Sequence, residues 1–262
     1  MGGDPGLFGP GSVTWELNRE QAVLLAGPAA AVLQVAHPQV ARGVAAHSRF
    51  REDATGRLMR TLDAVYTVAF GSMEEVRVVK ERVAEAHRAV RGPGYSAFDP
   101  GAQLWVLATL IMGSYEIARH VTGPLSMEEK ERFLEENSRF GEVFGLSRDR
   151  VPRGWVAFEE YWRGMLEGDV LGSDPICGEV ARAVVRPVRP LTFRLLSPVL
   201  EGLAVGLMPE RLVAKLGLRK GAGTRWLWGI LRGGLRWMVP RLPGGIRFAP
   251  AYHRACRRLR VG

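Results

Sequence analysis

Residues 99–121, DPGAQLWVLATLIMGSYEIARHV, decide the fold class of this 262-residue chain. Asp99 is of a residue type that caps helix N-termini, and Pro100 lacks the N–H that goes unpaired in a first helical turn. Apolar residues then follow on most sides of the predicted helix, which indicates burial among other helices. We therefore predict a long buried helix over about residues 100–121.

Helix signals recur along the rest of the chain, and we find no convincing alternation of apolar and polar residues bounded by hairpin turns. Ser72 with Glu75, and Ser126 with Glu129, have the S-x-x-E spacing of a capping box. Residues 1–262 are therefore expected to form a single all-α domain. The other predicted helices cover residues 16–26, 28–36, 38–47, 55–70, 72–91, 126–144, 152–167, 175–186, 191–207, 209–216, 222–239 and 248–260.

The composition is that of a globular protein, since 47% of the residues are apolar. Cys177 and Cys256 lie far apart and form no C-x-x-C pair, so neither a disulfide framework nor a cysteine-rich zinc site is indicated. No run of about 18 apolar residues is present, and the first residues lack the pattern of a signal peptide. We expect a cytoplasmic protein.

The net charge of +9 is unevenly distributed. Residues 171–262 form a basic C-terminal layer with 17 Lys plus Arg and 4 acidic residues, a charge of +13, whereas residues 1–170 carry −4. After Glu210 no acidic residue occurs, and arginines alternate with Trp226, Trp228 and Trp237. This mixture is typical of proteins that bind the surface of anionic membranes, here the inner face of the cell membrane. A solvated cationic face is an equal alternative, and nucleic acid is a weaker one because no binding motif accompanies the charge.

His87 stands out among the five histidines because of its position. In the predicted helix 72–91, His87 lies at steps of three and four from a row of valines, which predicts that it faces the core with them. The row consists of Val76, Val79, Val83 and Val90. A buried imidazole needs a hydrogen-bond partner or a metal. Periodicity alone favours a histidine that bonds to a neighbour, and it leaves metal ligation open.

The preceding helix places Arg57, Arg60, Thr61 and Ala64 on one face. Two guanidinium groups beside a hydroxyl can bind an anionic group such as a carboxylate, or stabilise a reduced oxygen species. The alternative is that both arginines reach water while their stems cover apolar surface.

The order of several short motifs resembles the oxygenase family that includes latex clearing protein (rubber oxygenase) and the endoplasmic-reticulum oxygenase of mycophenolic acid biosynthesis. The motifs run through nearly the whole chain: Ala36-His37-Pro38, Ala46-His47-Ser48-Arg49-Phe50, Arg57-x-x-Arg60-Thr61, Phe70-Gly71, His87-Arg88-Ala89-Val90-Arg91-Gly92, Tyr95-Ser96-Ala97-Phe98-Asp99-Pro100, Leu104-Trp105-Val106, Pro124-Leu125-Ser126, Arg241-Leu242-Pro243 and Arg247-Phe248-Ala249-Pro250-Ala251-Tyr252.

The resemblance implies a globin-like all-α core that binds haem b, with His87 as the proximal iron ligand. Arg57 and Thr61 would then be distal catalytic groups or propionate contacts, and Arg60 would also contact the cofactor. The implied activity is that of an oxidoreductase that uses O2 on an apolar, lipid- or isoprenoid-like substrate. The alternative is a non-catalytic membrane-surface or lipid-binding protein of the same fold that has lost haem.

Two departures from the family pattern affect the expected activity. Arg60 occupies the place of a lysine that can reach the iron in rubber oxygenases, and a guanidinium is a poor ligand because it stays protonated. Rubber oxygenases are also secreted, and no export signal is visible here. Cleavage of rubber is therefore not expected.

Overall fold

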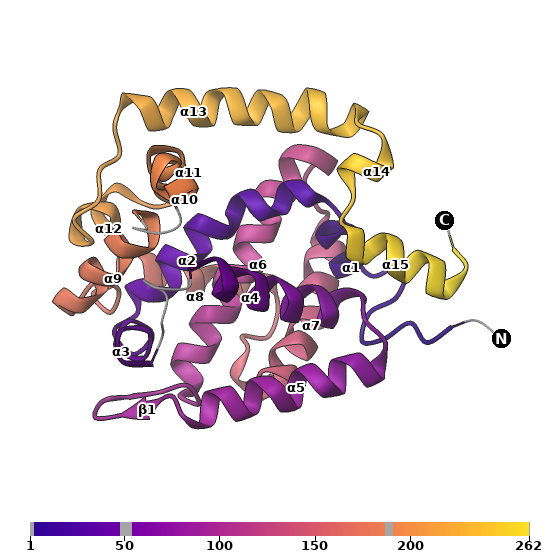
Figure 1. Cartoon of the computed structure of the whole chain (residues 1–262), viewed down its shortest axis with the longest axis horizontal. Coiled ribbons are helices and arrows are strands. Elements are labelled where there is room, and N and C mark those ends of the chain that lie inside the picture. Colours follow the sequence, from indigo (N-terminus) through magenta and orange to yellow (C-terminus); the bar gives the residue numbers. More distant parts are fainter. Residues whose placement is uncertain (1–2, 48–53, 187–190, 262) are drawn as a thin grey trace.

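The computed structural model describes residues 3–47, 54–186 and 191–261, and it confirms the predicted all-α class (Figure 1). The globin-like core stays a prediction. The elements are α1 (Val13–Asn18), η1 (Gln21–Ala26), α2 (Gly27–Ala36), α3 (Pro38–His47), α4 (Ala54–Phe70), α5 (Met73–Arg88), β1 (Arg91–Gly92), β2 (Tyr95–Ser96), α6 (Pro100–Thr122), α7 (Met127–Val143), η2 (Arg148–Arg150), α8 (Trp155–Glu167), α9 (Pro175–Val185), α10 (Leu191–Leu195), α11 (Ser197–Gly206), α12 (Glu210–Lys215), α13 (Ala222–Gly233), η3 (Gly234–Met238), η4 (Val239–Arg241), α14 (Gly244–Arg247) and α15 (Pro250–Leu259).

Helix α6 is the central helix, as its sequence predicts. The Asp99 carboxylate accepts a hydrogen bond from the backbone N–H of Ala102 at 2.8 Å and caps the first turn. The Trp105 side chain is fully buried, and its indole N–H donates to the Leu33 carbonyl on α2 at 2.6 Å. Helices α2 and α6 pack against each other, and α4 crosses α6 in the view of Figure 1.

Both predicted capping boxes are present, at the starts of α5 and α7. The predicted helix 16–26 is wrong: the structure has α1 ending at Asn18 and a separate 3-10 turn from Gln21. The sequence also gave no indication of the two-residue hairpin β1–β2, which pairs Arg91 with Ser96 beyond the end of α5. These differences are local, and the order of the long helices is as expected.

The C-terminal helices pack on the rest of the chain through close backbone contacts. Helix α13 lies on α11, where the Trp228 indole donates to the Gly202 carbonyl at 3.0 Å. A Cβ atom on Gly206 would stand 1.4 Å from the Trp228 ring nitrogen, so only glycine permits this approach. Trp228 was expected among the membrane-facing tryptophans, and its burial corrects that expectation.

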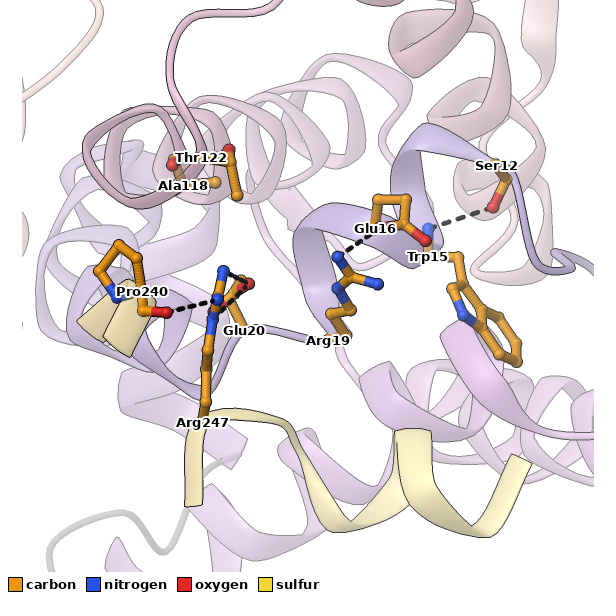
Figure 2. A network of polar contacts seen from close by, with 9 residues as sticks. All are labelled: Ser12, Trp15, Glu16, Arg19, Glu20, Ala118, Thr122, Pro240 and Arg247. Atoms are coloured by element: carbon orange, nitrogen blue, oxygen red, sulfur yellow. Dashed lines mark hydrogen bonds and ion pairs between the residues drawn. The ribbon is translucent and has the colours of Figure 1, made fainter. Parts of the chain in front are cut away.

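A buried ion pair joins the basic layer to the N-terminal part (Figure 2). Glu20 has no solvent exposure, and its carboxylate accepts hydrogen bonds from Nε and Nη2 of Arg247, the latter at 2.6 Å. The Nη1 atom of Arg247 donates to the Pro240 carbonyl at 3.2 Å. At least one arginine of the basic layer therefore forms a buried ion pair that stabilises the fold.

Among the described residues, no single helix combines the length and apolarity needed to cross a membrane. The segments Gln21–Ala36 and Pro38–His47 meet that test only as a pair, bent by 100°.

Candidate functional site

Helices α4 and α5, which follow each other in the chain, carry the predicted site residues. Gly71 and the Ser72 cap reverse the chain between the two helices, which then run antiparallel. An ion pair of 2.8 Å between two exposed side chains joins Asp63 on α4 to Arg82 on α5. Arg60 and Thr61 precede Asp63, and His87 follows Arg82, so all three lie farther from the turn than this ion pair does.

His87 lies on the apolar stripe of α5, in the last turn of the helix. Val76 and Val79 are buried, Val83 packs against the core, and His87 is half-buried one turn further along. The burial of Val76 and Val79 confirms that this helix face turns inward, and the His87 ring lies half-buried on the same face.

The surroundings of the His87 ring are apolar on the side that the structure describes. Its Nδ1 atom is shielded from solvent and has no hydrogen-bond partner among the described residues, and the Phe98 ring packs edge-on at a centroid distance of 6.1 Å. Burial lowers the pKa of His87 below its ordinary value of 6.5, because desolvation disfavours the imidazolium. The ring is therefore neutral at pH 7, which is the form that binds metals.

The partners predicted on α4 are more open to solvent than His87. Arg60 and Thr61 are exposed, while Ala64 on the same helix face is buried. The backbone of Arg57 belongs to α4, but its side chain lies outside the described residues, as do Ser48, Arg49 and Phe50 of the second motif. Arg60 and Thr61 are thus exposed residues of the helix that precedes α5; their proximity to His87 stays a prediction, as does the position of the Arg57 side chain.

Three exposed apolar residues on or near the α4 and α5 helices were not predicted from the sequence. The side chains of Leu58 and Met59, next to Arg60, are exposed although they are apolar. Phe98, which precedes the α6 cap, is likewise exposed on its far side while its ring contacts His87. Exposed apolar side chains are therefore present next to Arg60 in α4 and against the His87 ring, and no periodicity in the first turns of α4 signals them.

His37 is a second buried histidine near the start of α6. It ends α2, its Nδ1 atom is buried without a hydrogen-bond partner among the described residues, and burial lowers its pKa while the Asp99 carboxylate opposes that shift. The His87 ring thus packs against Phe98, and the charge of the next residue, Asp99, acts on His37. His37 belongs to the first of the family motifs and lies between two predicted helices, but it was not predicted as a site residue.

The described residues contain no group of three or more His, Cys, Asp and Glu side chains that could hold a metal ion between them. A haem iron needs only one or two protein ligands, because the macrocycle provides four. His87, with a neutral ring and an unpaired buried nitrogen, has the donor chemistry for that position.

The fold and the site together define an all-α protein with a half-buried imidazole packed against an exposed aromatic ring. The sequence matches the family described as "ER-bound oxygenase mpaB/B'/Rubber oxygenase, catalytic domain" over residues 15–239, and the chain belongs to this family. It is also 30% identical over 152 residues to two uncharacterized proteins, Rv2237 of Mycobacterium tuberculosis and Mb2261 of Mycobacterium bovis. That match covers 52% of this chain and 57% of each relative. No solved structure matches the chain.

Proposed function

We propose that this protein is a haem b-dependent oxygenase that acts on an apolar small molecule and O2. The observation that carries the proposal is the half-buried His87 ring, whose Nδ1 atom has no partner among the described residues. Membership of an oxygenase family supports the reaction class. The exposed Phe98 ring beside His87, with the exposed Leu58 and Met59 on α4, supports the substrate class, which we propose to be lipid- or isoprenoid-like.

In this proposal, His87 holds the iron through a neutral imidazole nitrogen. When bound, haem supplies the redox chemistry with O2 that amino-acid side chains lack. Desolvation favours the neutral ring over the imidazolium, so the nitrogen lone pair is available at neutral pH. Protons compete for the same lone pair, and the affinity of His87 for iron should fall as the pH decreases through the imidazole pKa.

The α4 residues have separate proposed roles. The guanidinium groups of Arg57 and Arg60 could bind carboxylates such as haem propionates. The Thr61 hydroxyl can donate a hydrogen bond to a distal oxygen atom or accept one. Leu58 and Met59 offer apolar contact to the substrate. Arg60 would bind anionic groups of the cofactor and would not ligate the iron, because a guanidinium is a hydrogen-bond donor without an acceptor site.

A second candidate function is a helical membrane-surface or lipid-binding protein that has lost haem. The exposed Trp226 and Trp237 side chains favour it. A cytoplasmic protein located peripherally at the inner face of the membrane is compatible with either function. The two differ in one respect: the second candidate binds no haem through His87.

Haem titration of the purified protein tests the proposal. We expect a Soret band that His87→Ala removes and that added imidazole restores. His120→Ala is the matched control, since His120 lies in the last turn of α6, at the opposite end from Phe98. A band that persists unchanged in His87→Ala, or no band in the wild type after reconstitution, contradicts haem ligation by His87.

Oxygen uptake tests the reaction. Haem-loaded protein should consume O2 in the presence of an unsaturated fatty acid as an apolar probe, and Thr61→Val should slow this uptake about 10- to 1000-fold if the hydroxyl assists the oxygen chemistry. Equal uptake by the wild type and Thr61→Val, with equal Soret bands, would remove Thr61 from the catalytic groups.

A further inference from the structure

Helix α13 and the π-helical turn η3 that continues it pack one face against the rest of the protein. Trp228 and Leu235 are buried against α11 and α6, and Thr224 is buried with them. The close approach at Gly202 and Gly206 shows that this face is packed as tightly as a core. Exposed side chains of this segment therefore belong to its other faces.

The opposite face carries large apolar side chains. Trp226, Ile230 and Trp237 recur at steps of four and seven residues, which places them on one side of the helix. They are exposed by 71%, 53% and 61%, and we refer to them as the outer stripe. Figure 1 shows α13 along the upper edge of the molecule, where no other helix covers it. Two exposed indoles on one stripe are unusual for a surface that contacts only water.

Arginines flank the outer stripe. Arg225, Arg232 and Arg236 recur at steps of seven and four, so they form a second exposed row next to the first. The Arg236 and Arg241 guanidinium groups each lie 5.7 Å from the centroid of the Trp237 ring. The combination is thus cationic and aromatic along the whole segment.

These arginines differ from the other basic residues of the C-terminal layer. Arg247, Arg186 and Arg211 form ion pairs with Glu20, Glu201 and Asp169. In the part of the chain that the structure describes, no carboxylate pairs with Arg225, Arg232 or Arg236, and the sequence has no acidic residue after Glu210. The positive charge of this face is therefore available to an anionic partner.

We propose that the outer stripe and its arginines dock on the surface of an anionic lipid bilayer. Indole rings favour the headgroup level of a membrane, and guanidinium groups bind lipid phosphates, so the two rows match the two layers of that surface. Ile230, between the two tryptophans, would enter the acyl boundary. The helix would lie in the plane of the membrane without crossing it.

This surface is independent of the proposed haem chemistry. In Figure 1, α13 runs along the upper edge while α5, which carries His87, runs along the lower edge. The docking face therefore shares no residue with α4 or α5, and loss of haem leaves it intact. Docking would also leave the His87 end directed away from the bilayer.

Co-sedimentation of the full chain with vesicles tests the proposal. We expect partitioning onto vesicles that contain phosphatidylglycerol and little onto vesicles of phosphatidylcholine alone. Replacing Arg225, Arg232 and Arg236 by Gln should lower partitioning about 100-fold, as three arginines at an anionic surface would contribute. The control replaces the exposed Arg163, Arg254 and Arg257 by Gln, which removes the same charge elsewhere.

The two triple variants separate a specific face from total charge. Equal losses in both variants, or no binding of the wild type to anionic vesicles, overturn the proposal. So does binding to a DNA oligonucleotide with no binding to vesicles, which would make nucleic acid the partner. Melting curves that match the wild type exclude unfolding as the cause of a loss.

Fluorescence quenching then reports the orientation. Doxyl-labelled lipid should quench the tryptophan emission of the bound protein, because Trp226 and Trp237 are exposed while Trp15, Trp105, Trp155 and Trp228 are buried. The variant Trp226→Phe/Trp237→Phe should lose most of this quenching while it still sediments. Unchanged quenching in that variant would place another face on the bilayer and contradict the proposal.

Discussion

The buried pair of Glu20 and Arg247 predicts a large effect from a substitution far from the candidate site. Arg247→Met keeps most of the side-chain volume and removes the charge. Glu20 has no solvent exposure, and Arg247 is only 17% exposed, so the carboxylate left behind has no water to replace its three hydrogen bonds. Removing one partner of a buried pair costs about 3–5 kcal/mol.

Urea denaturation measures this cost. With a slope of about 2 kcal/mol per molar urea, the midpoint of unfolding should fall by about 1.5–2.5 M in Arg247→Met. The double variant Glu20→Leu/Arg247→Met should recover much of the loss, because it buries no unpaired charge. Arg77→Met is the surface control, since Arg77 also forms two ion pairs but both of its partners, Glu74 and Glu81, are exposed.

The control should leave the midpoint unchanged. Equal shifts in Arg247→Met and Arg77→Met would refute the reasoning, because burial would then make no difference to the cost. A double variant no more stable than the single Arg247→Met variant would refute it as well, since the unpaired carboxylate could not be the source of the loss.

The remaining predictions concern pH, packing and the α4 site. Burial lowers the pKa of His37 below 6.5, so the unfolded chain binds more protons than the folded one, and the free energy of unfolding should fall as the pH drops below about 6.5. Urea titrations at several pH values should show a weaker fall in His37→Leu than in the wild type. An equal fall in the two proteins would contradict the assignment to His37. Gly206→Ala should lower the free energy of unfolding by about 1–3 kcal/mol, because its Cβ atom would overlap the Trp228 ring. Gly229→Ala on α13, where a Cβ atom would meet open space, should be neutral or stabilising in the same denaturation experiments. Equal losses in the two variants would count against the packing argument. Arg60→Lys introduces a side chain that can ligate iron when deprotonated, so the Soret band of the haem-loaded variant should shift at alkaline pH, and an unshifted band would mean that this position does not face the iron.

The sequence predicted the parts of the fold that local chemistry determines. The helix after Asp99 and the two capping boxes depend on residues within one turn of each other, and all are present. The valine stripe of α5 placed His87 on the inward face for the same reason, because helical periodicity is local. The family assignment also followed from short motifs in order along the chain.

Long-range contacts account for what the sequence could not predict. Glu20 and Arg247 are 227 residues apart, and neither neighbourhood signals a partner. Trp226 and Trp228, two residues apart, necessarily point to different sides of α13, but the side that packs is decided by Gly202 and Gly206 on another helix. The exposed Leu58 and Met59 were missed because exposure depends on what the rest of the fold leaves uncovered.

The ultraviolet–visible spectrum of the freshly purified, full-length protein tests the central claim most directly. We predict a Soret band from bound haem, of full intensity in the His120→Ala control and absent from His87→Ala that is otherwise folded. A wild-type spectrum without this band, which also fails to develop one when haem is added, would contradict the proposal that the buried His87 imidazole serves as an iron ligand.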